Sequence, residues 1–119
     1  MIYTTYFAHL RKVDPAIIPY NISLWAPKGY IGRSCNYLFP TKAILDHWKL
    51  WHDPEAYARE YGIAVLSKLD PNAVVKQINA ETRGREFAFV CYEKTGDFCH
   101  RYLVAQWLIN AGYEVKELD

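Results

Sequence analysis

The apolar run Glu86–Tyr92 constrains the fold of this chain more than any other segment. It is short and nearly continuous in apolar residues, which is typical of a strand buried on both faces of a parallel sheet. A turn follows, then a helical pattern over Phe98–Ala111 that stops at Gly112, and Tyr113–Leu118 forms a closing strand. A strand-helix-strand unit of this kind requires parallel strands joined by a right-handed crossover.

The first two thirds of the chain add two strands and three helices. Ile2–Phe7 and Tyr20–Leu24 carry the β-branched and aromatic residues typical of strands. The helices each begin after a residue that can cap a helix: Thr41, Asp53 and Asp70. Together these elements predict a small three-layer α/β sandwich with a mostly parallel sheet, built as a single domain over residues 1–119.

Charge and composition restrict the partners that such a chain can have. A formal net charge of +1 gives no broad basic surface, which argues against nucleic acid as a partner. No apolar stretch approaches the roughly 20 residues of a membrane helix, and the first residues do not resemble a signal peptide. The odd count of three cysteines (Cys35, Cys91 and Cys99) then favours reduced thiols and a cytoplasmic location.

Five chemically capable side chains lie close together in the C-terminal unit: Cys91, Glu93, Cys99, His100 and Arg101. The first two lie at the carboxyl end of the buried strand, where α/β sheets bind ligands. The other three open the next helix, where free N–H groups and the helix dipole favour an anion. Helical spacing points His100 at the sheet and places Arg101 beside the crevice, where it could grip a phosphate or carboxylate.

Ordinary structural roles compete with this interpretation. A buried histidine can simply satisfy a carbonyl, a free cysteine often only packs, and Glu93 with Arg101 could be a plain ion pair. Structural zinc sites usually contain paired C-x2-C motifs, which the spacing of Cys91, Cys99 and His100 lacks. We therefore expect neither a metal nor another cofactor. A Cys91–Cys99 disulfide is geometrically conceivable across the turn, although no C-x-x-C motif supports redox work.

The same residues carry a resemblance to a known family. A strand ending Val90-Cys91-Tyr92-Glu93, then Phe98-Cys99-His100-Arg101 opening a helix and a final strand after Gly112, resembles domain-of-unknown-function family 488 (DUF488). The segment 22–29 is similar, more loosely, to the second strand and Trp-Pro-rich loop of that family. The resemblance implies a fold and a functional role for the five residues, but no reaction.

One departure from the family pattern lies at the end of the second strand. Many members carry Asp and Arg there, whereas this chain has Ser23, Leu24 and Trp25. If those charged groups matter in the family, this chain has a variant function or relies on Lys28 or Arg33 instead.

The loop after the second strand is the second candidate region. It is long, contains Gly29 and Gly32, and belongs to a chain in which 16% of residues are aromatic. Four aromatic side chains gather in or near this loop without a periodicity that would bury them: Trp25, Tyr30, Tyr37 and Phe39. We expect Trp25 or Tyr30 to cover a ligand ring, with Lys28 and Arg33 as further ligand-binding residues.

Three functions remain open at this point. The first is a pocket for an anionic small molecule, nucleotide- or nucleoside-like, with Arg101 holding the anion. The second is an enzyme in which Cys99 or Cys91 is the nucleophile, assisted by His100 or Glu93. The third is a non-enzymatic module that sequesters a ligand or docks on another protein, including a second copy of itself. In the third case, exposed aromatic side chains would mark the interface: Trp48, Trp51 or Tyr57.

Overall fold

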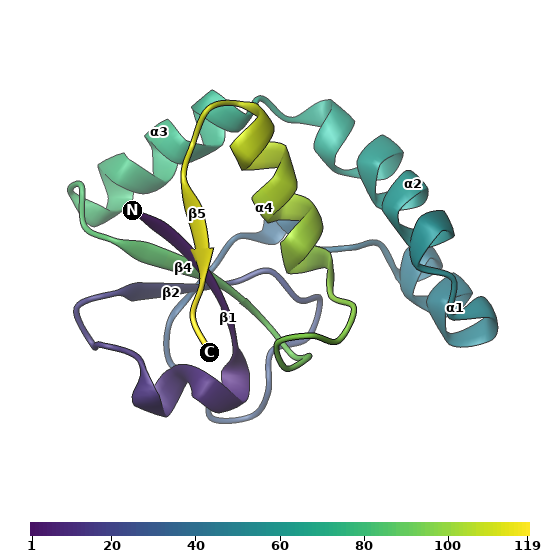
Figure 1. Ribbon diagram of the computed structural model, residues 1–119, viewed down its shortest axis with the longest axis horizontal. Coiled ribbons are helices and arrows are strands. Elements are labelled where there is room, and N and C mark those ends of the chain that lie inside the picture. The colour runs from purple at the N-terminus through teal and green to yellow at the C-terminus, as the bar shows by residue number, and fades with distance from the viewer.

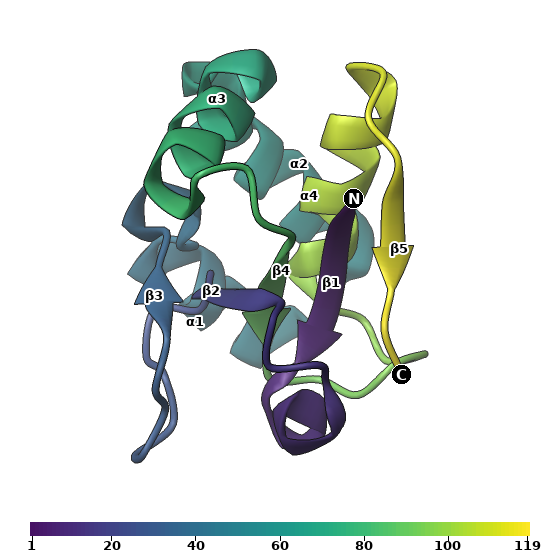
Figure 2. The same cartoon turned by 90° about the vertical axis from the view of Figure 1, so that its left-hand side faces the viewer.

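A five-stranded sheet forms the centre of the structure, a computed structural model that describes residues 1–119 (Figure 1). Its strands are β1 (Ile2–Tyr6), β2 (Ile18–Asn21), β3 (Arg33–Ser34), β4 (Phe87–Cys91) and β5 (Val115–Glu117). They lie in the order β3-β2-β4-β1-β5, which Figure 2 shows from left to right. Every pair is parallel, so the sheet is more uniform than predicted. The central strand β4 is buried along its whole length, as its apolar sequence predicted.

Four α-helices follow the sequence signals. They are α1 (Lys42–Trp51), α2 (Pro54–Ala64), α3 (Pro71–Thr82) and α4 (His100–Asn110). The three predicted caps are confirmed, because Thr41, Asp53 and Asp70 each accept a hydrogen bond from an N–H of the first turn. Short 3-10 helices complete the chain: η1 (Phe7–Lys12), η2 (Asn36–Leu38) and η3 (Leu66–Lys68).

The sheet separates two unequal layers. In Figure 1, α3 and α4 lie above the sheet and η1, the purple coil, lies below it. Phe87, Phe89 and Cys91 face the helices and belong to the hydrophobic core. On the opposite face η1 and the loop after β2 form the outer layer, where Phe7 packs edge-on against Tyr30. The α/β sandwich is therefore confirmed, with a thinner second layer that contains no α-helix.

Element boundaries differ from expectation at two places that matter for the site. The second strand ends at Asn21 and not at Leu24, because the Asn21 side chain accepts a hydrogen bond from the Ser23 N–H and turns the chain. Helix α4 begins at His100, and Cys99 before it has an extended backbone. At the other end Gly112 has the left-handed conformation expected of a helix stop (φ +99°).

None of the helices has the length and apolar character that crossing a membrane would require.

Candidate functional site

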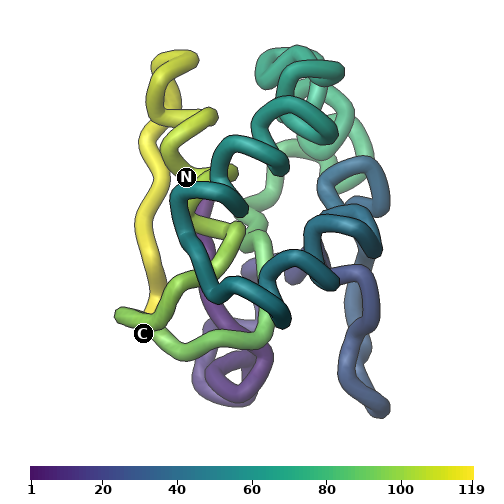
Figure 3. The backbone as a smooth tube through the Cα atoms, turned by 90° about the vertical axis from the view of Figure 1, so that its right-hand side faces the viewer, coloured from purple at the N-terminus to yellow at the C-terminus, as the bar shows by residue number.

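A pocket of about 340 Å³ opens at the carboxyl edge of the sheet. Residues of the segments that follow β2 and β4, of α1 and α2, and of the start of α4 line it. Figure 3 shows the backbone from the side of the molecule on which α1 and α2 lie. The chain leaves β2 toward one edge of the sheet and leaves β4 toward the other. A crevice forms where neighbouring strands diverge in this way, and ligands of parallel α/β proteins bind there. Of the five candidate residues in the C-terminal unit, Glu93, Cys99 and His100 line this pocket.

Aromatic side chains make up much of the pocket wall: Trp25, Trp48, Tyr57, Tyr92 and Phe98. The Phe98 ring lies 4.8 Å from the Trp48 ring and 5.1 Å from the Tyr57 ring, centroid to centroid. These three side chains support one another, so the inner wall is fixed by packing. The side chain of Trp25 is 61% exposed. The backbone carbonyl oxygen of Trp25 accepts a hydrogen bond from the hydroxyl of Tyr92.

Few polar side chains line this pocket, and the two charged ones, Lys49 and Glu93, have opposite signs. Ser23 lies at its buried side, whereas the side chains of Lys49 and Glu93 are exposed. Lys49 is the only lysine or arginine in the lining. A ligand would therefore meet an aromatic surface with one ammonium and one carboxylate group. The other polar groups of the lining are the hydroxyls of Ser23, Tyr57 and Tyr92 and the imidazole of His100.

His100 points at the sheet, as predicted from helical spacing. Its ring is buried, and Nε2 lies 2.7 Å from the carbonyl oxygen of Ile22. Because a carbonyl only accepts, Nε2 carries the proton in this contact and Nδ1 keeps its lone pair. Burial lowers the pKa of His100 to about 4, although the bond to Ile22 opposes the shift. The imidazole is neutral near pH 7 and does not supply a positive charge to the pocket.

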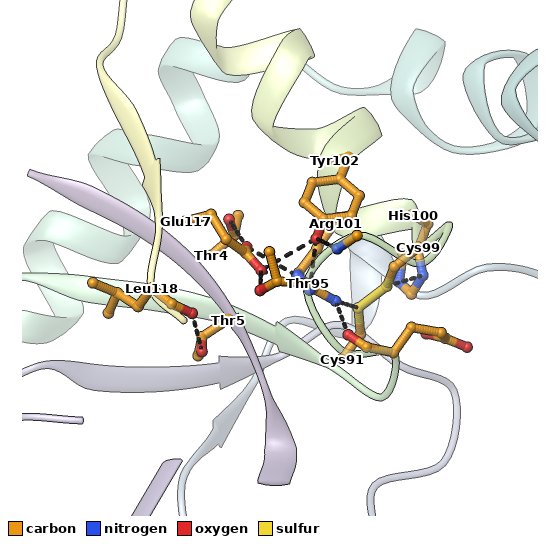
Figure 4. A network of polar contacts seen from close by, with 12 residues as sticks. Thr4, Thr5, Cys91, Thr95, Cys99, His100, Arg101, Tyr102, Glu117 and Leu118 are labelled. Atoms are coloured by element: carbon orange, nitrogen blue, oxygen red, sulfur yellow. Dashed lines mark hydrogen bonds and ion pairs between the residues drawn. A yellow bond between two sulfur atoms is a disulfide. The ribbon is translucent and has the colours of Figure 1, made fainter. Parts of the chain in front are cut away.

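Arg101 corrects one expectation about the site. It is fully buried and does not line the pocket. Its guanidinium donates five hydrogen bonds, two to Glu117 and one each to Cys91 Sγ, the Glu93 carbonyl and the Tyr102 hydroxyl (Figure 4). A guanidinium has five N–H groups, so no donor remains for a ligand's anion. Arg101 instead ties α4 to the ends of β4 and β5.

Cys91 and Cys99 form a disulfide that links the end of β4 to the start of α4 (Figure 4). Both are buried, and Cys99 lines the pocket while Cys91 lies behind it. The expectation of reduced thiols therefore applies only to Cys35, which is free and buried elsewhere in the core. Burial raises the pKa of the Cys35 thiol to about 11, which makes it an inert packing residue.

The loop residues predicted to bind ligand are not brought to the pocket, with the exception of Trp25. Lys28, Tyr30 and Arg33 are absent from its lining. The Tyr30 hydroxyl donates a hydrogen bond to the Arg33 carbonyl at 2.6 Å. The Tyr30 ring packs against the Phe7 ring on the other face of the sheet. The cause is β3, which pairs with β2 at the outer edge of the sheet and draws this loop away from β4.

Sequence reasoning missed the part of the pocket that α1 and α2 supply. Trp48 and Tyr57 were expected as exposed markers of an interface, because an aromatic residue on a helix has the same spacing whether it packs in the core, lines a pocket or faces a partner. No signal identified Lys49. Of the three residues proposed to mark an interface, Tyr57 is buried, which corrects that expectation, whereas Trp51 is 59% exposed.

Comparison with known proteins identifies the family. A model described as the active DUF488-N3 subclade (DUF488-N3a) matches residues 15–112, most of the chain, including β2, β4 and the whole of α4. Comparisons with curated proteins and with solved structures found no match. The resemblance that the Cys91–Arg101 segment indicated is thereby confirmed, and the chain belongs to the DUF488-N3 group of the DUF488 family.

Proposed function

We propose that the pocket binds a small molecule that joins a planar ring to an anionic group, of the nucleoside- or nucleotide-like class. The observation that carries this proposal is the aromatic pocket of about 340 Å³ with Lys49 as its single cationic side chain. Pockets for small organic ligands have volumes of this order and combine an apolar wall with few polar groups.

The aromatic wall favours a ring over a flexible chain. Trp48 and Phe98 are held by mutual packing, so their orientation is set before a ligand arrives. Trp25 is more exposed, and its side chain is free to close against the outer face of a ring. Stacking of a base on an aromatic side chain contributes about 1–3 kcal/mol.

The polar groups favour a ligand with an anion and a hydrogen-bond donor. Lys49 takes the role that the sequence suggested for Arg101, whose donors are all engaged within the protein. Glu93 can only accept hydrogen bonds when ionised, so it suits a ring amine or a sugar hydroxyl. Attraction between Lys49 and a phosphate across solvent is screened by salt, so affinity falls as ionic strength rises.

Tryptophan fluorescence tests this function directly, because Trp25 and Trp48 line the pocket. The protein is titrated with purine and pyrimidine nucleosides and their 5′-monophosphates. We expect saturable quenching, with monophosphates binding more tightly than nucleosides at low salt. Trp25→Ala weakens binding, whereas Trp51→Ala, which removes an equally exposed tryptophan outside this pocket, leaves it unchanged.

A second pair of variants tests the charge. Lys49→Gln removes the preference for monophosphates, while Lys76→Gln, an exposed lysine on α3 away from the pocket, retains it. Absence of a saturable response from the wild-type protein at millimolar ligand rejects the proposal. Equal losses in Trp25→Ala and Trp51→Ala also reject this pocket as the binding site.

Cysteine-dependent catalysis is the second candidate, favoured by one observation. Cys99 lines the pocket, and its sulfur lies 4.0 Å from Nδ1 of His100. The matching subclade is described as active, which supports an enzymatic role. The Cys99 thiolate would exist only after reduction of its bond to Cys91. The test is alkylation of the reduced protein across pH, and an activated nucleophile requires a thiol that titrates below the ordinary value of about 8.5.

A further inference from the structure

We propose that Cys91, Cys99 and His100, once the two cysteines are reduced, bind a thiophilic cation of the Zn²⁺ type. The coordination position left over would face the pocket. This inference does not depend on the ring-binding proposal, because the ion is held by other side chains and its binding is measured without an organic ligand.

The three donor atoms converge on one buried point. One ligand atom from each residue lies within 4.8 Å of the other two, and all three residues are buried. Zinc bonds of about 2.3 Å to sulfur and 2.0–2.1 Å to nitrogen put tetrahedral donors about 3.5–3.8 Å apart. The distance of 4.0 Å from Cys99 Sγ to His100 Nδ1 is close to that separation. The two sulfurs are bonded to each other in the disulfide, so after reduction they must separate to about 3.5–3.8 Å, which requires rotation of the Cys91 and Cys99 side chains.

The backbone leaves room for an ion between the sulfurs. The Cα atoms of Cys91 and Cys99 lie 7.3 Å apart. Disulfides usually span about 4.4–6.8 Å between these atoms. The wider spacing suits two cysteine ligands of one ion, because their sulfurs must stand further apart than bonded sulfurs do.

His100 is already arranged as a metal ligand. Its Nε2–H donates to the carbonyl oxygen of Ile22, which leaves the lone pair on Nδ1, the nitrogen on the Cys99 side. Histidine ligands of metals characteristically donate the other ring N–H to a carbonyl or carboxylate in this way, which fixes the tautomer and the ring orientation.

Charge balance favours a divalent ion at this buried position. Two thiolates and Zn²⁺ sum to zero, and the neighbouring Arg101 and Glu117 form a neutral pair. Nη1 of Arg101 lies 3.2 Å from Cys91 Sγ, so it can donate to a thiolate there and stabilise it. A buried neutral assembly of this kind avoids the penalty that an isolated charge incurs.

The disulfide and the ion exclude each other. A dithiol reductant gives two electrons and two protons to the Cys91–Cys99 bond, and the reductant leaves as its own disulfide. The ion then binds two thiolates and displaces their two protons. Two-electron oxidation restores the S–S bond and removes both sulfur ligands, so the ion is released.

Three protein ligands leave a fourth zinc position unfilled by the chain. Cys99 and His100 both line the pocket, so water or a ligand atom reaches that position from the pocket side. Three protein ligands and one exchangeable position are the arrangement of catalytic zinc sites, whereas structural sites use four protein ligands.

Cobalt titration of the reduced protein under anaerobic conditions tests the site. Co²⁺ replaces Zn²⁺ in tetrahedral sites, and its thiolate charge-transfer absorption grows with the number of sulfur ligands. We expect one Co²⁺ per chain with this absorption and tetrahedral visible bands, displaced by one equivalent of Zn²⁺. Cys91→Ser and Cys99→Ser lower the absorption, and Cys35→Ser, which removes the cysteine outside the cluster, leaves it unchanged.

The oxidised wild-type protein is the internal control that needs no variant. It must show no thiolate-to-cobalt absorption, and reduction alone must restore it. The proposal is overturned if the reduced wild type lacks this absorption, if the oxidised protein retains it, or if Cys35→Ser abolishes it. Circular dichroism of each variant establishes that a lost signal does not come from unfolding, and a folded Cys99→Ser protein with full absorption also rejects the site.

Discussion

Arg101 and Glu117 form a two-pronged ion pair between the first turn of α4 and the last residue of β5. Nε donates to Oε1 at 3.1 Å and Nη2 donates to Oε2 at 2.7 Å. The arginine side chain is fully buried and that of Glu117 is 18% exposed. Thr4 and Thr95 also donate to this carboxylate, so the pair connects β1, β5 and the loop before α4 (Figure 4). Nη1 of Arg101 also donates to Cys91 Sγ, so the network contacts the Cys91–Cys99 link, of which Cys99 lines the pocket.

Loss of Arg101 destabilises the protein strongly. Arg101→Met leaves the Glu117 carboxylate partly buried without its partner, and breaking a buried pair costs about 3–5 kcal/mol. Urea unfolding measures the change. Arg59→Gln, an exposed arginine on α2, should stay within about 0.5 kcal/mol of wild type. The double variant Arg101→Met/Glu117→Gln should recover part of the loss, and no recovery would argue against the pairing.

Acid sensitivity follows from the same pair. Burial alone would raise the pKa of Glu117, but the hydrogen bonds from Arg101, Thr4 and Thr95 outweigh it and lower the pKa below its ordinary value. A lowered folded-state pKa contributes stability above the unfolded value of about 4.3, which is lost as pH falls through the folded value. Wild type should therefore exceed Glu117→Gln in stability at pH 7, and the difference should shrink on acidification below about pH 4.

Glu114→Gln is the matched control for this acid effect, because Glu114 is exposed on the adjoining segment. Its unfolding free energy should follow that of wild type across the same pH range. A constant difference between wild type and Glu117→Gln from neutral to acid pH would show that the Glu117 charge is not involved.

The sequence predicted those helices and strands that are determined by interactions between residues close together in the chain. Asp53 and Asp70 cap helices through N–H groups two or three residues away, so a few letters of sequence suffice. β4 was evident because both of its faces are buried. In contrast, β3 has two exposed polar residues, Arg33 and Ser34, and exists because it pairs with β2. A strand of this kind has no hydrophobic pattern from which it could be predicted.

The site was readable only in its C-terminal half. His100 faces the sheet because helical periodicity requires it. The partner of Arg101 lies sixteen positions further along the chain on β5, so its burial could not be deduced from the segment around it. The contributions of Trp48 and Lys49 depend on where α1 packs, a long-range outcome of the crossover from β3 to β4. Proximity in sequence therefore found the sulfur-imidazole cluster and missed the part of the pocket wall that α1 and α2 supply.

Two glycines should respond in opposite directions to the same substitution. Gly112 has φ +99°, so Gly112→Ala forces a side chain into the left-handed region at a cost of about 1–2 kcal/mol. Gly62 lies within α2, and a Cβ there would meet no atom within 4 Å. Gly62→Ala should stabilise the protein by about 0.5–1 kcal/mol. Thermal unfolding of both variants measures the contrast, and equal shifts would contradict it.

The three cysteines should separate by reactivity according to their redox state and their contact with the pocket. In the oxidised native protein, Cys91 and Cys99 are bonded and Cys35 is buried with a thiol pKa raised by burial to about 11, so iodoacetamide should modify no cysteine. After reduction, Cys99 should be alkylated before Cys35, because Cys99 lines an open pocket and Cys35 does not. Timed quenching and peptide mass spectrometry identify the order.

Zn²⁺ added before the alkylating reagent should slow the modification of Cys99 and leave Cys35 unaffected. Early modification of Cys35 in the folded protein would contradict both its burial and its assignment as a packing residue.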